Sequence, residues 1–200
     1  MQAVQEIIAR AVPLDRSDVD TDQIIPSDWL KRVERTGFGE GLFSEWRERS
    51  DFVLNQDRFR DAQILVAGPN FGTGSSREHA VWALEDYGFR AVISPRFADI
   101  FRNNCFKIGL VPVELPQDVV TRILRTVDED PSVEIVIDVV DRRVAVPAID
   151  LDEPFQLDDH THHRLLHGLD DIGLTLERDT EIANYEAGRP AWAPKVRAEF

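Results

Sequence analysis

The middle of the chain alternates short, wholly apolar runs with longer amphipathic stretches. The apolar runs cover residues 64–67, 91–94 and 110–113. Between them, apolar side chains recur every three or four residues over about 76–87 and 97–107, a spacing typical of α-helices, and Gly88 and Gly109 follow as helix-ending glycines. Strand, helix, strand, helix and strand at this spacing predict a parallel sheet with right-handed crossovers.

The pattern after residue 115 adds a further helix and a hairpin. A helix is expected over about 117–126. Two apolar strands follow, over 133–140 and 144–146, and the charged residues between them predict a turn with antiparallel pairing. The fold class is therefore mixed α/β.

The C-terminal part of the chain has a sequence pattern typical of helices. From about Asp158 the sequence predicts one helix through His167, then a turn, and a second helix that ends before Gly188. We therefore expect an α/β domain over residues 1–157 and a C-terminal helical extension over residues 158–200 that packs on it.

The first 60 residues carry a weaker pattern, in which we expect no long regular element. Ser27 begins a short capped helix, which Gly37, Gly39 and Gly41 soon interrupt. Glycine relaxes the steric limits on the backbone. These three residues therefore predict a mobile loop over residues 33–43, of a kind that closes over ligands.

Composition narrows the classes of function. The chain has 23 Lys and Arg against 37 Asp and Glu, a net charge of −14, which disfavours general binding to nucleic acid or anionic lipid. No apolar run approaches the roughly 20 residues that a membrane span needs, and the first residues lack the basic and apolar regions of a signal peptide. We therefore expect a cytoplasmic protein without a membrane or nucleic-acid partner.

The single cysteine, Cys105, limits what the chain can hold. It cannot close an intrachain disulfide, and one thiolate cannot hold a zinc or iron–sulfur site that needs three or four ligands. Its apolar neighbours predict a buried, unreactive thiol. Any metal cluster must therefore be supplied by another chain.

The leading candidate site is the glycine-rich segment 68–80, between a predicted strand and a predicted helix at the carboxyl edge of the sheet. Open α/β sheets bind ligands at this edge. Its glycines allow close approach of the backbone, and the unpaired N–H groups of the helix start favour an anion. Ser75, Ser76 and Arg77 add two hydroxyls and a cation suited to a carboxylate.

Other interpretations of this segment are open. Ser75 with Glu78 three residues later also fits a capping box, in which the serine accepts from a backbone amide, and the pattern alone does not separate the two roles. The glycine spacing does not match a dinucleotide fingerprint, and no lysine precedes the serines as in a Walker A loop. Nucleotide binding is therefore disfavoured.

Two further polar clusters have structural explanations. Asp18, Asp20 and Asp22 stand at alternate positions like the start of a calcium loop, but the glycine and closing glutamate of such a loop are absent, so a turn with side-chain hydrogen bonds is favoured. Four histidines lack a cysteine or an evident third ligand, so surface or capping roles are favoured over metal binding. They are His160, His162, His163 and His167. No metal ligand is assigned.

Four segments, in order along the chain, carry a resemblance to a known family. They are DTDQIIP at 20–26, RTGFG at 35–39, the glycine-rich segment 68–80, and the stretch 97–113. Together they resemble the small subunits of the isopropylmalate isomerase (3-isopropylmalate dehydratase) family, a branch of the aconitase superfamily. The tail is similar to that of the bacterial members.

The resemblance implies a swivelling β/β/α domain, similar to the C-terminal domain of aconitase, that pairs with a separate large subunit holding a 4Fe-4S cluster. This chain itself is expected to hold no cofactor. The family's reaction interconverts 2-isopropylmalate and 3-isopropylmalate by removing and re-adding water in leucine biosynthesis. The chain is thus expected to be a hydro-lyase subunit that is active only in the complex.

The resemblance to aconitase also implies roles for single residues. Ser75 is expected to be the base that removes the carbon-bound proton, and Ser76 and Arg77 to bind a substrate carboxylate. A serine alkoxide needs a cation and oriented dipoles to offset its charge, which Arg77 and the helix start can supply. Asp22 matches an active-site aspartate that accepts hydrogen bonds from the partner or the substrate.

One departure from aconitase concerns specificity. An arginine that binds a third citrate carboxylate follows a Trp-Leu-Lys segment in aconitase, and the matching position here falls on or next to Val33. Isopropylmalate has an apolar group there, and a cation would forgo burial worth about 25 cal/mol per Å². We therefore expect Val33 to recognise the apolar group of the substrate, and Arg35 and Thr36 to add polar contacts when the loop closes.

Two alternative functions stay open. One is the small subunit of a related hydro-lyase, acting on homoaconitate or citraconate. The other is a stand-alone module that binds phosphate or another anion through the glycine-rich turn. Copurification with a larger iron–sulfur partner separates the enzyme from the module, and turnover with alternative diacids separates the enzymes.

Overall fold

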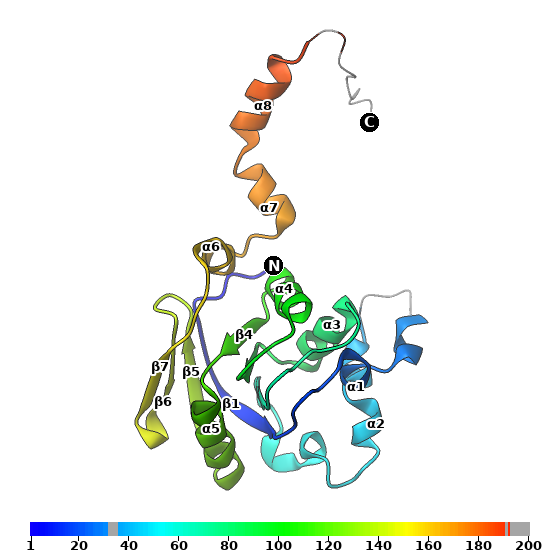
Figure 1. The fold of residues 1–200 in the computed structure, drawn as a ribbon, viewed down its shortest axis with the longest axis vertical. Coiled ribbons are helices and arrows are strands. Elements are labelled where there is room, and N and C mark those ends of the chain that lie inside the picture. Colours follow the sequence, from blue (N-terminus) through cyan, green and yellow to red (C-terminus); the bar gives the residue numbers. More distant parts are fainter. Residues whose placement is uncertain (32–35, 191, 193–200) are drawn as a thin grey trace.

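A computed structural model describes residues 1–31, 36–190 and 192. Within these residues the centre is a seven-stranded sheet (Figure 1). The strands are β1 (Glu6–Leu14), β2 (Ile64–Ala67), β3 (Ala91–Ser94), β4 (Val111–Glu114), β5 (Glu134–Asp138), β6 (Arg143–Val146) and β7 (Leu151–Pro154). Their order is β4-β3-β2-β1-β5-β6-β7, parallel from β4 to β1 and antiparallel from β1 to β7. The predicted parallel strands and antiparallel hairpin are confirmed.

Strand β1 joins the parallel and antiparallel halves of the sheet. Its residues 11–14 pair with β2 and its residues 6–10 pair with β5. The expectation of no long regular element in the first 60 residues is therefore wrong, because β1 has nine residues. The sequence pattern is weak because the first part alternates buried and exposed positions, whereas the second part is almost wholly buried.

The helices of the described residues are α1 (Thr21–Ile24), α2 (Ser44–Arg47), α3 (Glu78–Tyr87), α4 (Asp99–Ile108), α5 (Gln117–Glu129), α6 (Asp159–His167), α7 (Asp171–Leu176) and α8 (Asp179–Ala187). Four helices, α3 to α6, begin and end within three residues of their predicted positions, whereas the single helix predicted before Gly188 is two helices, α7 and α8, and the short helices α1 and α2 were not predicted. Gly88 and Gly109 end α3 and α4 in the left-handed conformation, with φ of 115° and 93°.

The core lies between the sheet and the helices. All residues of β2 and β3 are buried. Helix α5 packs against β1, β2 and β3, and its buried side chains follow the helical period. These are Val119, Val120, Ile123, Leu124 and Val127. The core thus fixes the carboxyl ends of the parallel strands, from which the loops of the candidate site emerge.

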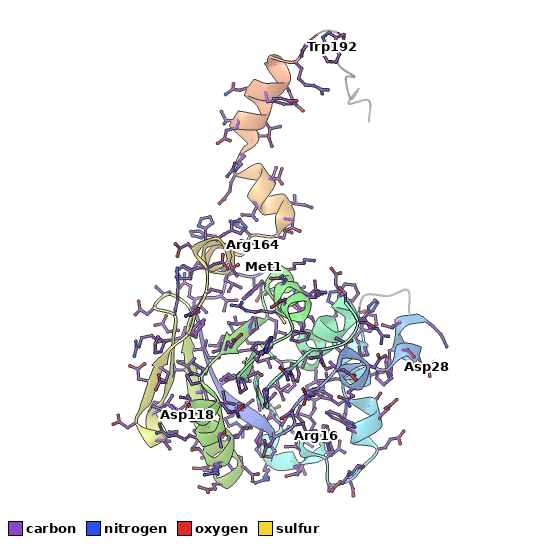
Figure 2. The ribbon with its side chains drawn as sticks, in the orientation of Figure 1. Met1, Arg16, Asp28, Asp118, Arg164 and Trp192 are labelled. Carbon is purple, nitrogen blue, oxygen red and sulfur yellow. The ribbon has the colours of Figure 1, made fainter. Side chains whose placement is uncertain are left out.

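The C-terminal helices differ in how much of their surface packs on the rest of the chain. The amide of Val4 donates to the carbonyl of Leu165 in α6 at 2.8 Å, and the Leu165 side chain is fully buried. Helices α7 and α8 bury none of their residues and extend away from the sheet towards Trp192 (Figures 1 and 2). The boundary at residue 157 stays a prediction. No helix in the described part of the chain is long and apolar enough to cross a membrane.

Candidate active site

Two loops of the candidate site emerge side by side because β1 and β2 are parallel neighbours. The loop after β1 leads to Asp22, and the loop after β2 leads to Ser75. Backbone hydrogen bonds join them: Gly72 N donates to the Val19 carbonyl at 2.8 Å, and Thr21 N donates to the Thr73 carbonyl at 2.9 Å. Residues some fifty positions apart in sequence therefore share one edge of the sheet.

Glycines let the second loop follow this path. Gly72 and Gly74 have φ of 79° and 88°, in the left-handed region that other residues rarely adopt. A side chain at Gly72 would also overlap the Phe101 ring of α4. The loop thus packs closely between α4 and the start of α1, which explains two of the glycines in the motif.

Helix α3 begins later than the capping box requires. Its N-cap is Arg77, without a side-chain capping bond, so Ser75 lies two residues before the cap. The capping interpretation of Ser75 is therefore wrong. Ser75 and Ser76 are exposed, and among the described residues the Ser75 hydroxyl makes no hydrogen bond. That hydroxyl stands free near the N-terminus of α3, whose first N–H groups favour negative charge.

The acidic segment directs its three carboxylates to three different partners. Asp20 caps α1 by accepting from Gln23 N at 2.7 Å, in a complete capping box. Asp18 accepts from the side chain of Asn70 at 2.8 Å. Asp22 pairs with Arg77. The interpretation as a turn with side-chain hydrogen bonds is thus confirmed.

The ion pair between Asp22 and Arg77 ties the two loops together beside Ser75. The Arg77 side chain is 20% exposed and that of Asp22 is 54% exposed, so the pair lies at the rim of the site and remains open to solvent. An arginine carries five donors, of which this pair uses Nη1. The guanidinium can therefore be oriented by Asp22 and still bind a further carboxylate.

The segment proposed as a mobile recognition loop is partly fixed. Val33 and Arg35 lie outside the described residues, and Thr36 is exposed at a bend. From Phe38 to Gly41 the chain forms a 3-10 helix that packs on α3, and Phe38 is 1% exposed. The expectation of mobility is wrong for this part.

The packing of Gly39 on α3 explains why residues 38–41 are fixed. The Gly39 amide donates to Asp86 Oδ2 at 2.9 Å, and a Cβ at Gly39 would lie 2.8 Å from the backbone nitrogen of Tyr87. The ring of Phe38 packs edge-on against His79, with centroids 5.3 Å apart. Gly39 thus serves close packing on α3. The sequence alone gave no such role to Asp86 or His79, because their contacts with Gly39 and Phe38 join segments more than forty positions apart.

The histidine cluster makes local contacts. His162 donates through Nε2 to the Val139 carbonyl at 2.9 Å, and His163 lies 3.2 Å from a carboxylate oxygen of Glu177. No group of three His, Cys, Asp or Glu within the described ranges is placed to hold a metal ion. Cys105 is fully buried, and burial raises the pKa of its thiol well above the usual value. The prediction of an unreactive thiol agrees with this.

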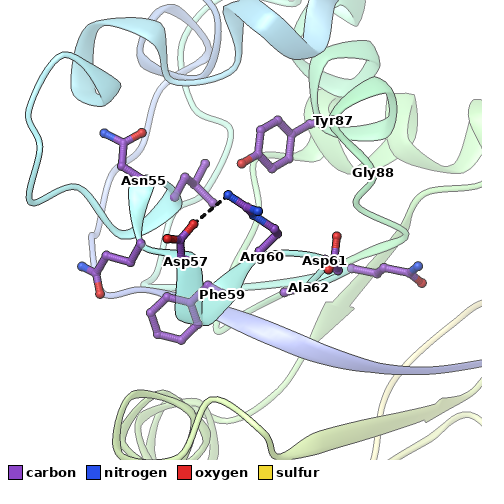
Figure 3. A pocket seen from close by; sticks show the side chains of 11 residues that line it. Asn55, Asp57, Phe59, Arg60, Asp61, Ala62, Tyr87 and Gly88 are labelled. Atoms are coloured by element: carbon purple, nitrogen blue, oxygen red, sulfur yellow. Dashed lines mark hydrogen bonds and ion pairs between the residues drawn. The ribbon is translucent and has the colours of Figure 1, made fainter.

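A cavity of about 500 Å³ is formed by residues between Leu54 and Gln63 and by the end of α3 (Figure 3). Its wall includes Tyr87 at the end of α3 and an ion pair of 2.7 Å between Asp57 and Arg60. Neither Asp22 nor any residue of 75–77 lines it. Because Ser75, Ser76 and Asp22 are exposed, the candidate site forms an open rim of this chain.

Comparisons with known proteins agree with this architecture. Residues 1–118 match the aconitase C-terminal domain, and residues 171–198 match the C-terminal domain of the 3-isopropylmalate dehydratase small subunit. The chain is 61% identical to the 3-isopropylmalate dehydratase small subunit of Frankia alni, covering 98% of this chain and 100% of that protein. It is 54% identical to that of Rubrobacter xylanophilus, with the same coverage.

A solved structure shows the same fold. The crystal structure of 3-isopropylmalate dehydratase (leuD) from Methanocaldococcus jannaschii superposes with a TM-score of 0.66 at 25% identity, covering 92% of this chain and 99% of that one. The swivelling α/β fold that the resemblance implied is thereby confirmed. On the identity and coverage of these relatives, the chain belongs to the family of 3-isopropylmalate dehydratase small subunits.

Proposed function

We propose that this chain is the small subunit of a 3-isopropylmalate dehydratase and contributes the base and the substrate-recognition residues of the reaction. The observation that carries the proposal is the exposed hydroxyl of Ser75, which has no hydrogen bond within the described residues and precedes by two positions the Arg77 of the Arg77–Asp22 ion pair and by three the start of α3. The substrate is 2-isopropylmalate or 3-isopropylmalate, interconverted by loss and re-addition of water in leucine biosynthesis.

The partner is a large subunit that carries a 4Fe-4S cluster. Such a cluster takes several thiolate ligands, and the one cysteine of this chain is fully buried in α4. The residues of this chain therefore do not fit the cluster, and the proposal assigns it to the partner. The open rim around Ser75 fits a site that two proteins complete together.

Ser75 is proposed to move the carbon-bound proton. Its alkoxide takes the proton on Oγ, the C–H electron pair forms the double bond, and hydroxide leaves from the neighbouring carbon. In the second half the proton returns from Oγ to the other carbon as hydroxide adds back. The positive charge of Arg77 and the helix dipole at the N-terminus of α3 lower the cost of the alkoxide.

The neighbouring residues are proposed to bind and orient the substrate. Ser76 and the free donors of Arg77 bind a carboxylate, and Asp22 holds the guanidinium in place through their ion pair. Val33 is proposed to contact the apolar isopropyl group, and Arg35 and Thr36 to supply polar contacts to the substrate beside it. Binding in a fixed orientation converts the proton transfer into an effectively unimolecular step.

The test is Ser75→Ala in the complex with the large subunit. We expect kcat to fall by about 10² to 10⁴, as loss of a general base does, with KM within a few-fold and assembly unchanged. Ser50→Ala makes the same chemical change at an exposed turn and should leave kcat unchanged.

Three outcomes would contradict the proposal. Full turnover by Ser75→Ala would remove the serine from the reaction. Faster turnover of homoaconitate or citraconate than of isopropylmalate would point to a related hydro-lyase. Phosphate binding by a chain that captures no larger iron–sulfur partner would point to a stand-alone module. The isolated chain should show no turnover.

A further inference from the structure

Thr21 is a buried polar residue that contacts the loop carrying Ser75. It is the first residue of α1 and is 2% exposed. Its hydroxyl donates to the carbonyl oxygen of Ser75 at 3.0 Å, while its amide donates to the carbonyl of Thr73 at 2.9 Å. One residue thus holds the loop at two points on either side of Gly74.

The hydroxyl contact falls in an exposed stretch of the loop. Gly74 has a φ of 88°, and Ser75 and Ser76 are both exposed. In the described part of the chain, the bond from Thr21 is the one hydrogen bond that reaches the backbone of Ser75 from outside the loop. The next fixed point is the pairing of Arg77 with Asp22, which directly follows Thr21 in sequence.

We propose that Thr21 is a positioning residue for Ser75. Its hydroxyl fixes the peptide group of Ser75 and thereby the direction in which Oγ points towards the substrate. This inference rests on the proposed role of Ser75 as the base. Displacement of a reacting group by about 1 Å can cost 10²-fold in rate, so a single hydrogen bond at this point has a large effect on kcat.

Capping of α1 does not explain the contact. Asp20 is the N-cap and completes its box with Gln23 by two hydrogen bonds, of 2.7 and 3.0 Å. The hydrogen bond from the Thr21 amide to Thr73 is made by the backbone and does not use the Thr21 side chain. The hydroxyl can therefore be removed while the cap and the backbone contact stay, which separates positioning from folding.

The experiment compares variants that differ by the hydroxyl alone. Thr21→Val keeps the size and branching of the side chain but loses the donor, and we expect kcat of the complex to fall 10- to 100-fold with KM within about twofold. Thr21→Ser keeps the donor and should restore kcat to within about threefold. Association with the large subunit and the urea midpoint of the full chain are measured in parallel.

A second pair keeps the test decisive. If Thr21→Val does not fold, Thr21→Ala against Thr21→Ser gives the same comparison, since both lack the methyl group. Equal kcat in the two members of a folded pair would overturn the positioning role. A rise in KM with kcat unchanged would overturn it as well.

The double variant separates this inference from the proposed function. In a Ser75→Ala background, Thr21→Val should have no further effect on the residual rate, because Thr21 acts through Ser75. A further loss of 10-fold or more would assign Thr21 a role independent of Ser75 and overturn the inference. Full activity of Ser75→Ala alone would instead refute the proposed base.

Discussion

The fixed packing of residues 38–41 on α3 predicts that Gly39→Ala destabilises the protein. The new Cβ would lie 2.8 Å from Tyr87 N and 2.9 Å from the Asp86 carbonyl carbon, against an ordinary contact of about 3.5 to 4.0 Å. Both are backbone atoms of a helix and cannot swing aside. The 3-10 helix must move outward, which stretches the 2.9 Å hydrogen bond from Gly39 N to Asp86.

The expected loss of stability combines the steric overlap of the new Cβ with the weakened hydrogen bond to Asp86. Overpacking costs about 1 to 3 kcal/mol, and a hydrogen bond to a partly exposed carboxylate contributes about 1 kcal/mol. We expect a loss of about 2 to 4 kcal/mol, which at a urea m-value of about 2 to 3 kcal/mol/M lowers the midpoint by roughly 1 M. Tryptophan fluorescence during urea unfolding of the full chain measures it.

The sign of the change tests the reasoning. In a mobile loop, Gly→Ala would raise stability by about 0.4 to 1 kcal/mol, because it restricts the unfolded chain. An unchanged or higher midpoint for Gly39→Ala would therefore refute the anchored arrangement. Gly188→Ala is the matched control, because its Cβ would meet no atom closer than 3.6 Å and its φ is −83°. Asp86→Ala should lose only the hydrogen-bond part, about 1 kcal/mol.

Two further predictions concern single ionisable groups. Cys105 should not react with a thiol reagent at pH 8 until the protein unfolds, because burial raises its pKa, and fast labelling of the native chain would contradict this. The hydrogen bond from the Thr161 amide lowers the pKa of Asp158, so its stabilising effect is present above about pH 4 and is lost as the pH falls further. Asp158 is the N-cap of α6. Asp158→Ala should therefore lower the stability of the protein by about 0.5 to 2 kcal/mol at pH 7, whereas Asp158→Asn should keep most of the capping interaction. Equal urea midpoints for these two variants at pH 7 would argue against capping.

The sequence by itself determined the elements whose signals are local. Local signals include the apolar runs that form β2 and β3 and the glycines that end α3 and α4. Each of these signals depends only on residues that are close in sequence. The motifs around Asp22 and Ser75 and their order along the chain also identified the candidate site from the sequence. Burial of Cys105 also followed from its apolar neighbours.

Only the tertiary structure decided how distant segments meet. Strand β1 has a mixed pattern because it pairs with β5 along one part and with β2 along the other, and sheet order is not a local property. The motif Ser-x-x-Glu could not show that α3 begins at Glu78, because packing of the preceding loop against α1 and α4 sets that start. The roles of Gly39 and Thr21 depend on atoms more than forty residues away, so their physical reason exists only once the chain has folded.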